Sequence, residues 1–229
     1  MVIQPIAKIY NDFPTKFGIP RQSGRITELK SRIIFEKTCR NEEAFRGLEQ
    51  FSHLWLIWEF SESKNRDWSP TVRPPRLGGN KRIGVFATRS PFRPNSLGLS
   101  CVKLEAIEKN EKYGIVLTVS GADLMNGTPI YDIKPYVPYA DCIEDAQGGF
   151  AEENKDYKAE VEIPEKLLKA IPENKKEALI KVLEDDPRPA YKNNIEKEYG
   201  FFFADREIKF TAKNNKIIVT DIIKRRIAE

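Results

Sequence analysis

The chain has 229 residues, 40% hydrophobic and 31% charged, a composition typical of a globular protein of one domain or of one domain with a small appendage. No apolar run approaches membrane-spanning length, which excludes a helical membrane protein. The formal net charge is +4, and residues 151–229 hold equal numbers of acidic and basic residues, so the whole excess lies in residues 1–150. That excess fits a phosphate-bearing partner, but charge alone fits a solvated surface equally well.

The cysteines and the histidine restrict the chemistry further. Cys39, Cys101 and Cys142 are isolated and form no CxxC pair, which indicates reduced cysteines in a cytoplasmic protein. The N-terminus lacks a charged-then-apolar leader, so we expect a soluble, cytosolic chain. His53 is the only histidine, which excludes a metal site built from imidazoles. Between Ser52 and an aromatic run, His53 is better explained as a hydrogen-bonded structural residue than as a catalytic base.

The first part of the chain predicts strands and one short helix. Residues 3–10 alternate imperfectly between apolar and polar side chains, and residues 32–36 repeat that pattern, so both are expected to be strands. Residues 41–48 predict a short helix that Asn41 caps. Residues 51–60 are rich in aromatic and β-branched side chains and predict a buried strand.

Residues 71–100 are the most distinctive stretch of the chain. They contain four prolines, four glycines, no acidic residue and six basic residues: Arg73, Arg76, Lys81, Arg82, Arg89 and Arg93. Prolines and glycines at this density exclude a helix interior or a central strand from most of the stretch. The apolar residues among them favour an ordered loop system around one short strand over a disordered linker. Such loops would present arginines to an anionic or carboxylate-bearing ligand.

The usual nucleotide-binding motifs are missing. No GxGxxG occurs, so a Rossmann-type cofactor loop has no support. Gly79 and Gly84 have the spacing of a phosphate loop, but Val85 and Phe86 follow in place of the required lysine and hydroxyl residue. An adenosyl cofactor would therefore have to bind to loops and strand ends of a β-fold.

The remainder of the chain predicts more strands and then a different kind of unit. Residues 100–108 and 113–120 form a predicted hairpin, a loop with an Asn-Gly turn spans 121–129, and residues 130–136 form a further strand. Beyond an acidic junction, residues 159–163 predict a strand, 164–171 and 173–184 two helices, and 199–203 and 217–223 two strands. The prediction is thus a mainly β protein with an α+β appendage, divided into residues 1–145 and 156–229.

Five segments, in the same order along the chain, resemble one known family. They are GIPRQSG at 18–24, FSHLW at 51–55, RPPRLGGNKRIGVFATRSPFRPNSLGLS at 73–100, NGTPIYDIKPYVPYAD at 126–141 and DPRPAY at 186–191. Together they look like the signature of the TsaA-like, or TrmO, family. The resemblance implies a small antiparallel β-barrel that binds S-adenosylmethionine and works as a homodimer. It also implies methylation of N6 of threonylcarbamoyl-adenosine at position 37 of certain tRNAs.

The resemblance also suggests which residues bind the cofactor. Arg89 would bind a carboxylate or orient the adenosyl ligand, and Leu99 would pack against an apolar part of it. By the same likeness, the other residues expected to bind the cofactor are Pro20, Arg21, Gln22, Ser61, Glu62, Ser120, Gly121, Ala122 and Asp123. No metal is implied.

Transfer to an exocyclic adenine nitrogen needs a proton acceptor, for which Asp132 and Asp186 are the candidates. Asp132 and Lys134 share one face of their strand, either as a solvated ion pair or, as the matching motif favours, at a binding surface. The residues expected to bind tRNA are Arg73, Arg76, Arg93, Lys134 and Arg188, with Tyr191 available to stack on a base. Each arginine could equally hold loop carbonyls, and the tyrosine could pack the appendage.

Three functions remain open from the sequence. The first is the tRNA methyltransferase. The second is a non-catalytic RNA-binding barrel, which the basic loops also predict. The third is a small-molecule-binding barrel that performs no chemistry.

Overall fold

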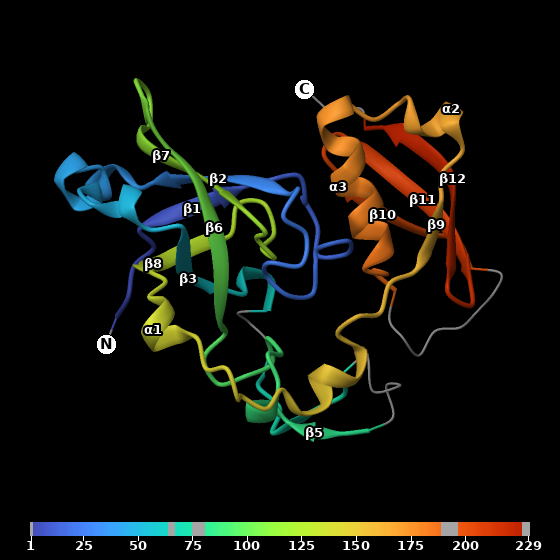
Figure 1. Cartoon of the computed structure of the whole chain (residues 1–229), viewed down its shortest axis with the longest axis horizontal. Helices are drawn as coiled ribbons and strands as arrows, with labels where there is room; N and C mark the ends of the chain where they lie inside the picture. Colours follow the sequence, from blue (N-terminus) through green and yellow to red (C-terminus); the bar gives the residue numbers. More distant parts are fainter. Residues whose placement is uncertain (1, 64–66, 75–80, 189–196, 226–229) are drawn as a thin grey trace.

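Six antiparallel strands close into a barrel that forms the first part of the molecule (Figure 1). The computed structural model describes residues 2–63, 67–74, 81–188 and 197–225. The barrel order is β1-β2-β7-β6-β3-β8. The strands are β1 (Ala7–Tyr10), β2 (Lys30–Phe35), β3 (His53–Glu59), β6 (Leu97–Asn110), β7 (Gly114–Ser120) and β8 (Pro129–Pro135). The predicted mainly β fold with a small antiparallel barrel is confirmed.

Strand β6 is the longest strand and turns a corner of the barrel. Its first half pairs with β3 and its second half with β7, and the register shifts between Leu104 and Ala106. A bulge of this kind bends a strand and increases its twist, which is what closing a small barrel requires. The hairpin predicted for β6 and β7 is confirmed, but β6 begins at Leu97, before the predicted start. Its first residues therefore reach the site described below.

The barrel interior is filled by alternate residues of each strand. On β3, Leu54, Leu56 and Trp58 are buried, whereas the residues between them are only partly covered. The aromatic stretch predicted as a buried strand is therefore buried on one face alone, as an antiparallel strand of a barrel should be. The helix expected after Asn41 is a 3₁₀ turn (Glu42–Phe45), with the Asn41 side chain accepting from the Glu43 N–H at 3.0 Å.

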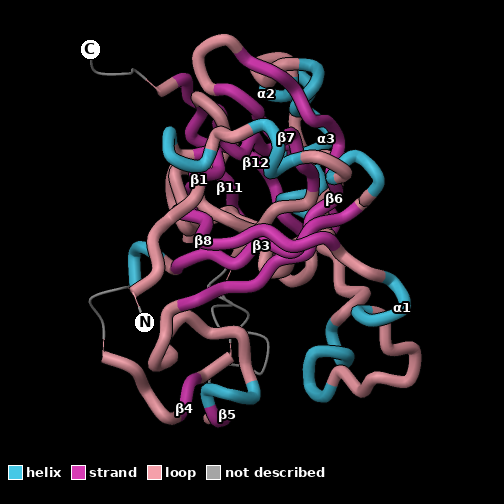
Figure 2. The backbone as a smooth tube through the Cα atoms, turned by 90° about the vertical axis from the view of Figure 1, so that its left-hand side faces the viewer, coloured by secondary structure: helices cyan, strands magenta, loops and turns pink. Residues whose placement is uncertain are grey.

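The described residues of the basic stretch, 71–74 and 81–100, form loops around a two-stranded ladder and end in the start of β6. β4 (Thr71–Val72) pairs with β5 (Ile83–Gly84), and a 3₁₀ turn (Val85–Ala87) follows, anchored by the buried Val85. Figure 2 shows this ladder below β3 and β8, outside the barrel wall. Loops are thus present as predicted in the described part of this stretch, but two strands of two residues each take the place of the one short strand expected. Residues 75–80 of the predicted loop system lie outside the described residues.

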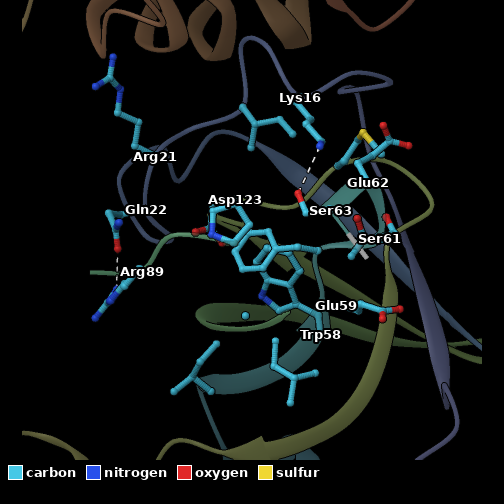
Figure 3. A pocket seen from close by; sticks show the side chains of 18 of the residues that line it. Lys16, Arg21, Gln22, Trp58, Glu59, Ser61, Glu62, Ser63, Arg89 and Asp123 are labelled. Carbon is cyan, nitrogen blue, oxygen red and sulfur yellow. Dashed lines mark hydrogen bonds between the residues drawn. The ribbon is translucent and has the colours of Figure 1, made fainter. Parts of the chain in front are cut away.

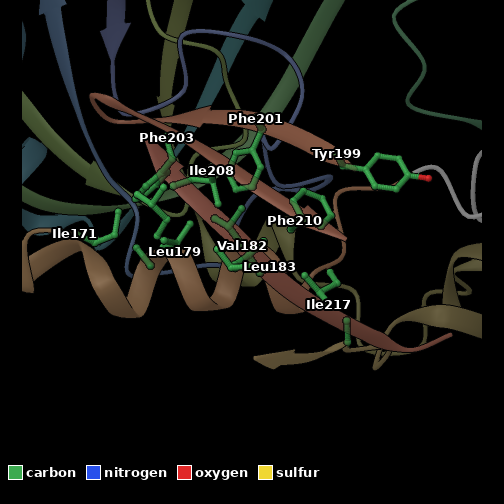
Figure 4. Packing of buried hydrophobic residues seen from close by; sticks show 14 of the residues in the cluster. Ile171, Leu179, Val182, Leu183, Tyr199, Phe201, Phe203, Ile208, Phe210 and Ile217 are labelled. Atoms are coloured by element: carbon green, nitrogen blue, oxygen red, sulfur yellow. The ribbon is translucent and has the colours of Figure 1, made fainter. Parts of the chain in front are cut away.

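A four-stranded sheet with two helices forms the second part of the molecule, in the order β10-β11-β12-β9. Its strands are β9 (Glu160–Glu162), β10 (Tyr199–Phe203), β11 (Arg206–Lys213) and β12 (Lys216–Lys224), and its helices are α2 (Glu165–Leu168) and α3 (Glu173–Glu184). Strand β9 is parallel to β12, and the other pairs are antiparallel. Helix α3 packs Leu179, Val182 and Leu183 against the sheet (Figure 4). The sequence interpretation missed β11, although its Ile208, Phe210 and Ala212 alternate into the core.

The connection between β1 and β2, residues 11–29, joins the two parts. Phe13, Ile26 and Leu29 from this connection are buried in the core of the C-terminal sheet and helix. Gly18, with φ of +100°, lies against the Phe201 ring, so close that a Cβ would be 2.4 Å from a ring carbon. The appendage is therefore attached to the barrel by shared hydrophobic packing. Among the described residues, no helix is long and apolar enough to cross a membrane.

This shared packing gives a stability prediction. Phe13 is 1% exposed and its ring centroid lies 5.6 Å from that of Phe203. Phe13→Ala is expected to lower the free energy of unfolding by about 3–5 kcal/mol, because a buried aromatic ring is removed and a cavity remains. Tryptophan fluorescence, which reports on the barrel part, and far-UV circular dichroism should follow one denaturant transition in the wild type. Two separate wild-type transitions would show that the parts unfold independently.

Candidate active site

A cavity of about 510 Å³ opens at the end of the barrel where β3 ends and β6 begins (Figure 3). Trp58 of β3 and Gly98 of β6 are cross-strand partners in its wall. A Cβ at Gly98 would lie 2.3 Å from a ring carbon of Trp58, so only glycine lets the indole lie flat against the β6 backbone. Four loops complete the cavity: the β1–β2 connection, the segment after β3, the basic loop around Arg89 and the β7–β8 loop.

A half-buried aspartate lies in this cavity. Asp123 follows β7, and its Oδ1 accepts a hydrogen bond from Ser100 Oγ at 2.5 Å. Ser100 in turn accepts from Trp58 Nε1 at 2.9 Å, so the hydroxyl proton is directed at the carboxylate. Burial raises the pKa of Asp123 above its ordinary value, although the Ser100 bond and the charge of Arg89 oppose this. A carboxyl group with a raised pKa in a cavity is a strong candidate for a functional residue.

Cationic side chains tie the loops of the cavity together. Arg89 Nη1 donates to Gln22 Oε1 at 2.5 Å and so joins the basic loop to the β1–β2 connection (Figure 3). Lys16 Nζ lies 3.5 Å from Ser63 Oγ.

A carboxylate at the cavity holds a tyrosine: Glu59 accepts from Tyr131 Oη at 2.8 Å. Burial and this carboxylate raise the pKa of Tyr131 to about 12.

The structure brings most of the expected cofactor residues together. Those that line the cavity are Pro20, Arg21, Gln22, Ser61, Glu62, Arg89, Leu99 and Asp123. The other three lie beneath the surface. Ser120 is buried and donates to Glu105 Oε1, and Ala122 is packed into the barrel core. The Gly121 carbonyl accepts from the Gly24 N–H at 2.8 Å, which supports the β1–β2 connection from below.

A larger cleft of about 1310 Å³ adjoins the cavity, between the basic loops and the C-terminal part. Pro20, Gln22 and Arg89 line both, so the two spaces share a wall. The cleft is rich in cations and aromatic rings. They are Lys16, Arg21, Arg25, Arg73, Arg82, Arg89 and Lys155, with Phe17, Phe86, Phe92 and Phe150. Phe86 is 75% exposed, an unusual position for a large apolar ring.

The residues expected to bind tRNA are dispersed. Arg73 lines the cleft. Arg93 lines the smaller cavity and donates to the carbonyls of Thr88 and Ser90, the alternative role that the sequence left open for this arginine. Arg76 and Tyr191 lie outside the described residues.

The two expected proton acceptors and their neighbours do not line the cavity. Asp132 forms an exposed ion pair with Lys134, 3.3 Å between Oδ2 and Nζ, on the barrel wall. Asp186 is buried in a two-bond ion pair with Arg188 in the C-terminal part. Burial alone would raise the pKa of Asp186, but the bonds and charge of Arg188 outweigh it and hold that pKa below its ordinary value. Within one chain, none of these four side chains lines the 510 Å³ cavity.

The sequence interpretation missed Trp58, Ser100 and Lys16 as site residues. Trp58 and Ser100 look like ordinary members of two apolar strands, and only the strand register shows that they meet. A hydroxyl at an inward position between the apolar residues of β6 is the signal that could have identified Ser100, since a buried hydroxyl needs a partner.

Comparisons with known proteins agree with this geometry. The model of the tRNA-methyltransferase O N-terminal domain matches residues 8–142, and that of the TrmO C-terminal domain matches residues 156–225. The chain is 38% identical over 218 residues to the tRNA (adenine(37)-N6)-methyltransferase of Escherichia coli K12, covering 90% of this chain and 91% of the relative. It is 39% identical over 214 residues to a putative S-adenosylmethionine-dependent methyltransferase of Pseudomonas aeruginosa, covering 90% of each. The crystal structure of TrmO from Pseudomonas aeruginosa superposes with a TM-score of 0.77 at 32% identity, covering 97% of this chain and 98% of that one.

Proposed function

Because this chain belongs to the tRNA-methyltransferase O family, we propose that it is an S-adenosylmethionine-dependent enzyme that methylates N6 of threonylcarbamoyl-adenosine at position 37 of tRNA. One observation carries the proposal: eight of the eleven expected cofactor residues, dispersed over a hundred positions of sequence, line one cavity whose wall is shared with a basic cleft. A cofactor and a nucleic acid could thus occupy adjoining spaces.

The residues of the cavity fit a charged adenosyl compound. Trp58 and Leu99 offer apolar surface to a purine or thioether portion, and Gln22 offers an amide for directional hydrogen bonds. The carboxylates of Glu59 and Glu62 suit an ammonium or sulfonium group, and Arg89 suits a carboxylate. When bound, the cofactor would supply a methyl group activated by its sulfonium centre. The protein then has to align the acceptor and exclude water.

We propose that Asp123 accepts the proton that the adenosine nitrogen loses. Its half-buried side chain lines the cavity, whereas Asp132 and Asp186 are engaged in ion pairs elsewhere. The Ser100 hydroxyl directs its hydrogen at Asp123 Oδ1, which fixes the orientation of the carboxylate in the cavity. A raised pKa makes this group a better proton acceptor than an exposed aspartate.

The cleft is the proposed path of the tRNA. Its cations can neutralise phosphates, and exposed Phe86 can stack on an unpaired base of the anticodon loop. The homodimer implied by the resemblance and the cytoplasmic location expected from the cysteines and the N-terminus remain predictions. Light scattering on the purified protein tests the first of them.

Arg89→Ala is expected to raise the Kd for S-adenosylmethionine by about tenfold or more. It removes a charged donor from the cavity and releases Gln22, and one hydrogen bond to a charged group contributes roughly 1.5–3 kcal/mol. Titration calorimetry measures the Kd, and circular dichroism should show an intact fold. An unchanged affinity would remove Arg89 from the site.

A methylation assay tests the proposal as a whole. Threonylcarbamoylated tRNA, unmodified tRNA and tRNA mutated at position 37 are incubated with labelled S-adenosylmethionine. We expect label only in the first. Cofactor binding without methylation of any RNA would favour the small-molecule-binding barrel, and RNA binding without cofactor binding would favour the non-catalytic RNA-binding barrel.

A further inference from the structure

The cofactor loop of the barrel is held from outside by the C-terminal part. The loop in question is residues 18–24 of the β1–β2 connection, which carries Pro20 and Gln22 into the cavity. Arg21 lies between them, but in Figure 3 its guanidinium points away from Trp58 and Asp123. Its Nη2 donates to two backbone carbonyls of the C-terminal part, that of Asp186 at 2.9 Å and that of Arg188.

The turn that offers these carbonyls is held rigidly. Asp186 has a positive φ of 49°, a conformation that aspartate tolerates better than most residues. Arg188 closes the turn with two parallel bonds of 2.8 Å, from Nε to Oδ1 and from Nη2 to Oδ2 of Asp186. The Arg188 N–H also donates to Oδ1, at 3.2 Å, and Tyr157 Oη donates to Oδ2, at 3.0 Å. A bidentate arginine–carboxylate pair of this kind fixes orientation as well as distance.

Burial decides whether Arg188 binds tRNA, as the sequence suggested, or holds the turn together. Asp186 is 8% exposed and Arg188 is 6% exposed, and their charges neutralise each other. Arg188 Nη2 also donates to the Asn214 carbonyl at 3.2 Å. A cation so covered cannot reach a phosphate without breaking the turn. Its bonds instead aim the peptide groups of residues 186 and 188 at Arg21.

We propose that the Asp186–Arg188 turn is a positioning element of the active site. It clamps Arg21 and thereby fixes Pro20 and Gln22 at the wall of the cavity. Arg188 and Asp186 then act on the cofactor without touching it, and Arg21 acts as the link between the C-terminal part and the cofactor loop. The inference rests on the proposed function only in naming the ligand of the cavity as S-adenosylmethionine.

A nearby ion pair joins the same two segments but lies farther from the cavity. Arg25 Nε pairs with Asp185 Oδ1 at 2.6 Å and ties the same connection to the end of α3. It lies three residues beyond Gln22, however, and does not line the smaller cavity. Arg21 is the neighbour of Gln22, so removing its side chain should affect the cavity more than removing that of Arg25.

A double-mutant cycle on the full chain tests the inference. Arg21→Met, Arg188→Met and the double variant are titrated with S-adenosylmethionine by calorimetry. We expect each single variant to raise the Kd by about fivefold to tenfold. The Kd of the double variant should not exceed the higher of the two single-variant values, because both changes break one link. If Arg21 instead touched the cofactor directly and Arg188 served only the fold, the Arg188 variant would bind normally, or the two effects would multiply.

Arg206→Met is the matched control. Arg206 lies in the same C-terminal part with a side chain that is 15% exposed, pairs with Asp205 at 2.6 Å and donates to the Ala170 carbonyl. These partners lie away from the cofactor loop, so its removal should lower Tm without changing the Kd. An equal rise in Kd for Arg206→Met would show that any destabilisation of this part weakens binding, and would overturn the proposal.

Two further measurements keep the test decisive. If Arg188→Met does not fold, Tyr157→Phe removes only the outer hydrogen bond of the turn and should raise the Kd by about twofold to threefold. Hydrogen exchange in the absence of ligand should show faster exchange of residues 18–24 in the Arg188 or Tyr157 variant than in the wild type. A wild type that does not bind S-adenosylmethionine would refute the proposed function, while unchanged exchange in both variants would refute the positioning role.

Discussion

Replacing Asp123 with asparagine is expected to lower kcat for tRNA methylation by about two to four orders of magnitude, the range for removal of a general base. Asparagine keeps an oxygen that can accept from Ser100 Oγ, now 2.5 Å from Asp123 Oδ1, but it cannot take a proton. Because burial raises the pKa of Asp123, the wild-type rate should fall as pH drops through that raised value, when the carboxyl group becomes protonated. Steady-state kinetics over a pH series measures both effects.

The contribution of Asp123 to the free energy of unfolding should change with pH in the opposite direction to the rate. A raised folded-state pKa means that the folded protein holds the proton more tightly than the unfolded chain. The stability that this binding gives is present below the ordinary pKa of aspartate and is lost as pH rises through the folded value. At neutral pH, Asp123 therefore costs stability, and Asp123→Asn should have a Tm equal to or above that of the wild type. The advantage should vanish in acid.

Glu62→Gln provides the matched control for this prediction. Glu62 lines the same cavity but is exposed, so its carboxylate is already solvated. Its amide variant should raise the Kd for the cofactor, because the carboxylate suits an ammonium or sulfonium group, but kcat at saturating cofactor should stay within a few fold of the wild type. If Asp123→Asn keeps its kcat and only raises the Kd for the cofactor, Asp123 is a binding residue and not the proton acceptor.

Neutralising Arg73 and Arg82 together is expected to weaken tRNA binding about a hundredfold at low salt. Both line the cleft between the basic loops and the C-terminal part, and each bond to a phosphate that is removed costs roughly 1.5–3 kcal/mol. The slope of log Kd against log salt should become shallower by about two units, one for each phosphate that is no longer neutralised. Filter binding of Arg73→Gln/Arg82→Gln over a salt series measures both quantities.

Lys8→Gln/Lys30→Gln is the control for charge. Both lysines are exposed on the strands of the barrel wall and line neither cavity, so the variant loses the same net charge at another place. Its affinity and salt slope should stay close to those of the wild type. Equal effects in the two double variants would mean that net charge, and not the cleft, attracts the RNA.

The sequence predicts the barrel well because alternation along a strand and turn residues between strands are local properties. The hairpin of β6 and β7 and the loops around Arg89 follow from them. The site could be predicted only in outline, since its chemistry depends on which residues meet. Nothing local to Asp123 indicates that Ser100 and Trp58 will lie against it. Likewise, the sequence suggests that Asp186 could accept a proton and that Arg188 could bind tRNA. Only the fold shows that the two side chains pair with each other.

The role of the connection between β1 and β2 could not be predicted for a similar reason. Its residues look like an ordinary loop, yet Phe13, Ile26 and Leu29 belong to the core of a unit encoded more than a hundred residues later. Packing across such a separation is invisible to patterns of period two or 3.6. The division into 1–145 and 156–229 remains a prediction, and residues 11–29 contribute to the packing of both parts.

A crystal structure of the protein with S-adenosylhomocysteine, the unreactive counterpart of the cofactor, tests the central claim most directly. We expect the ligand in the 510 Å³ cavity, with its adenosyl or amino-acid portion against Gln22, Trp58 and Arg89. A ligand bound at any other place, with this cavity left to solvent, would contradict the account.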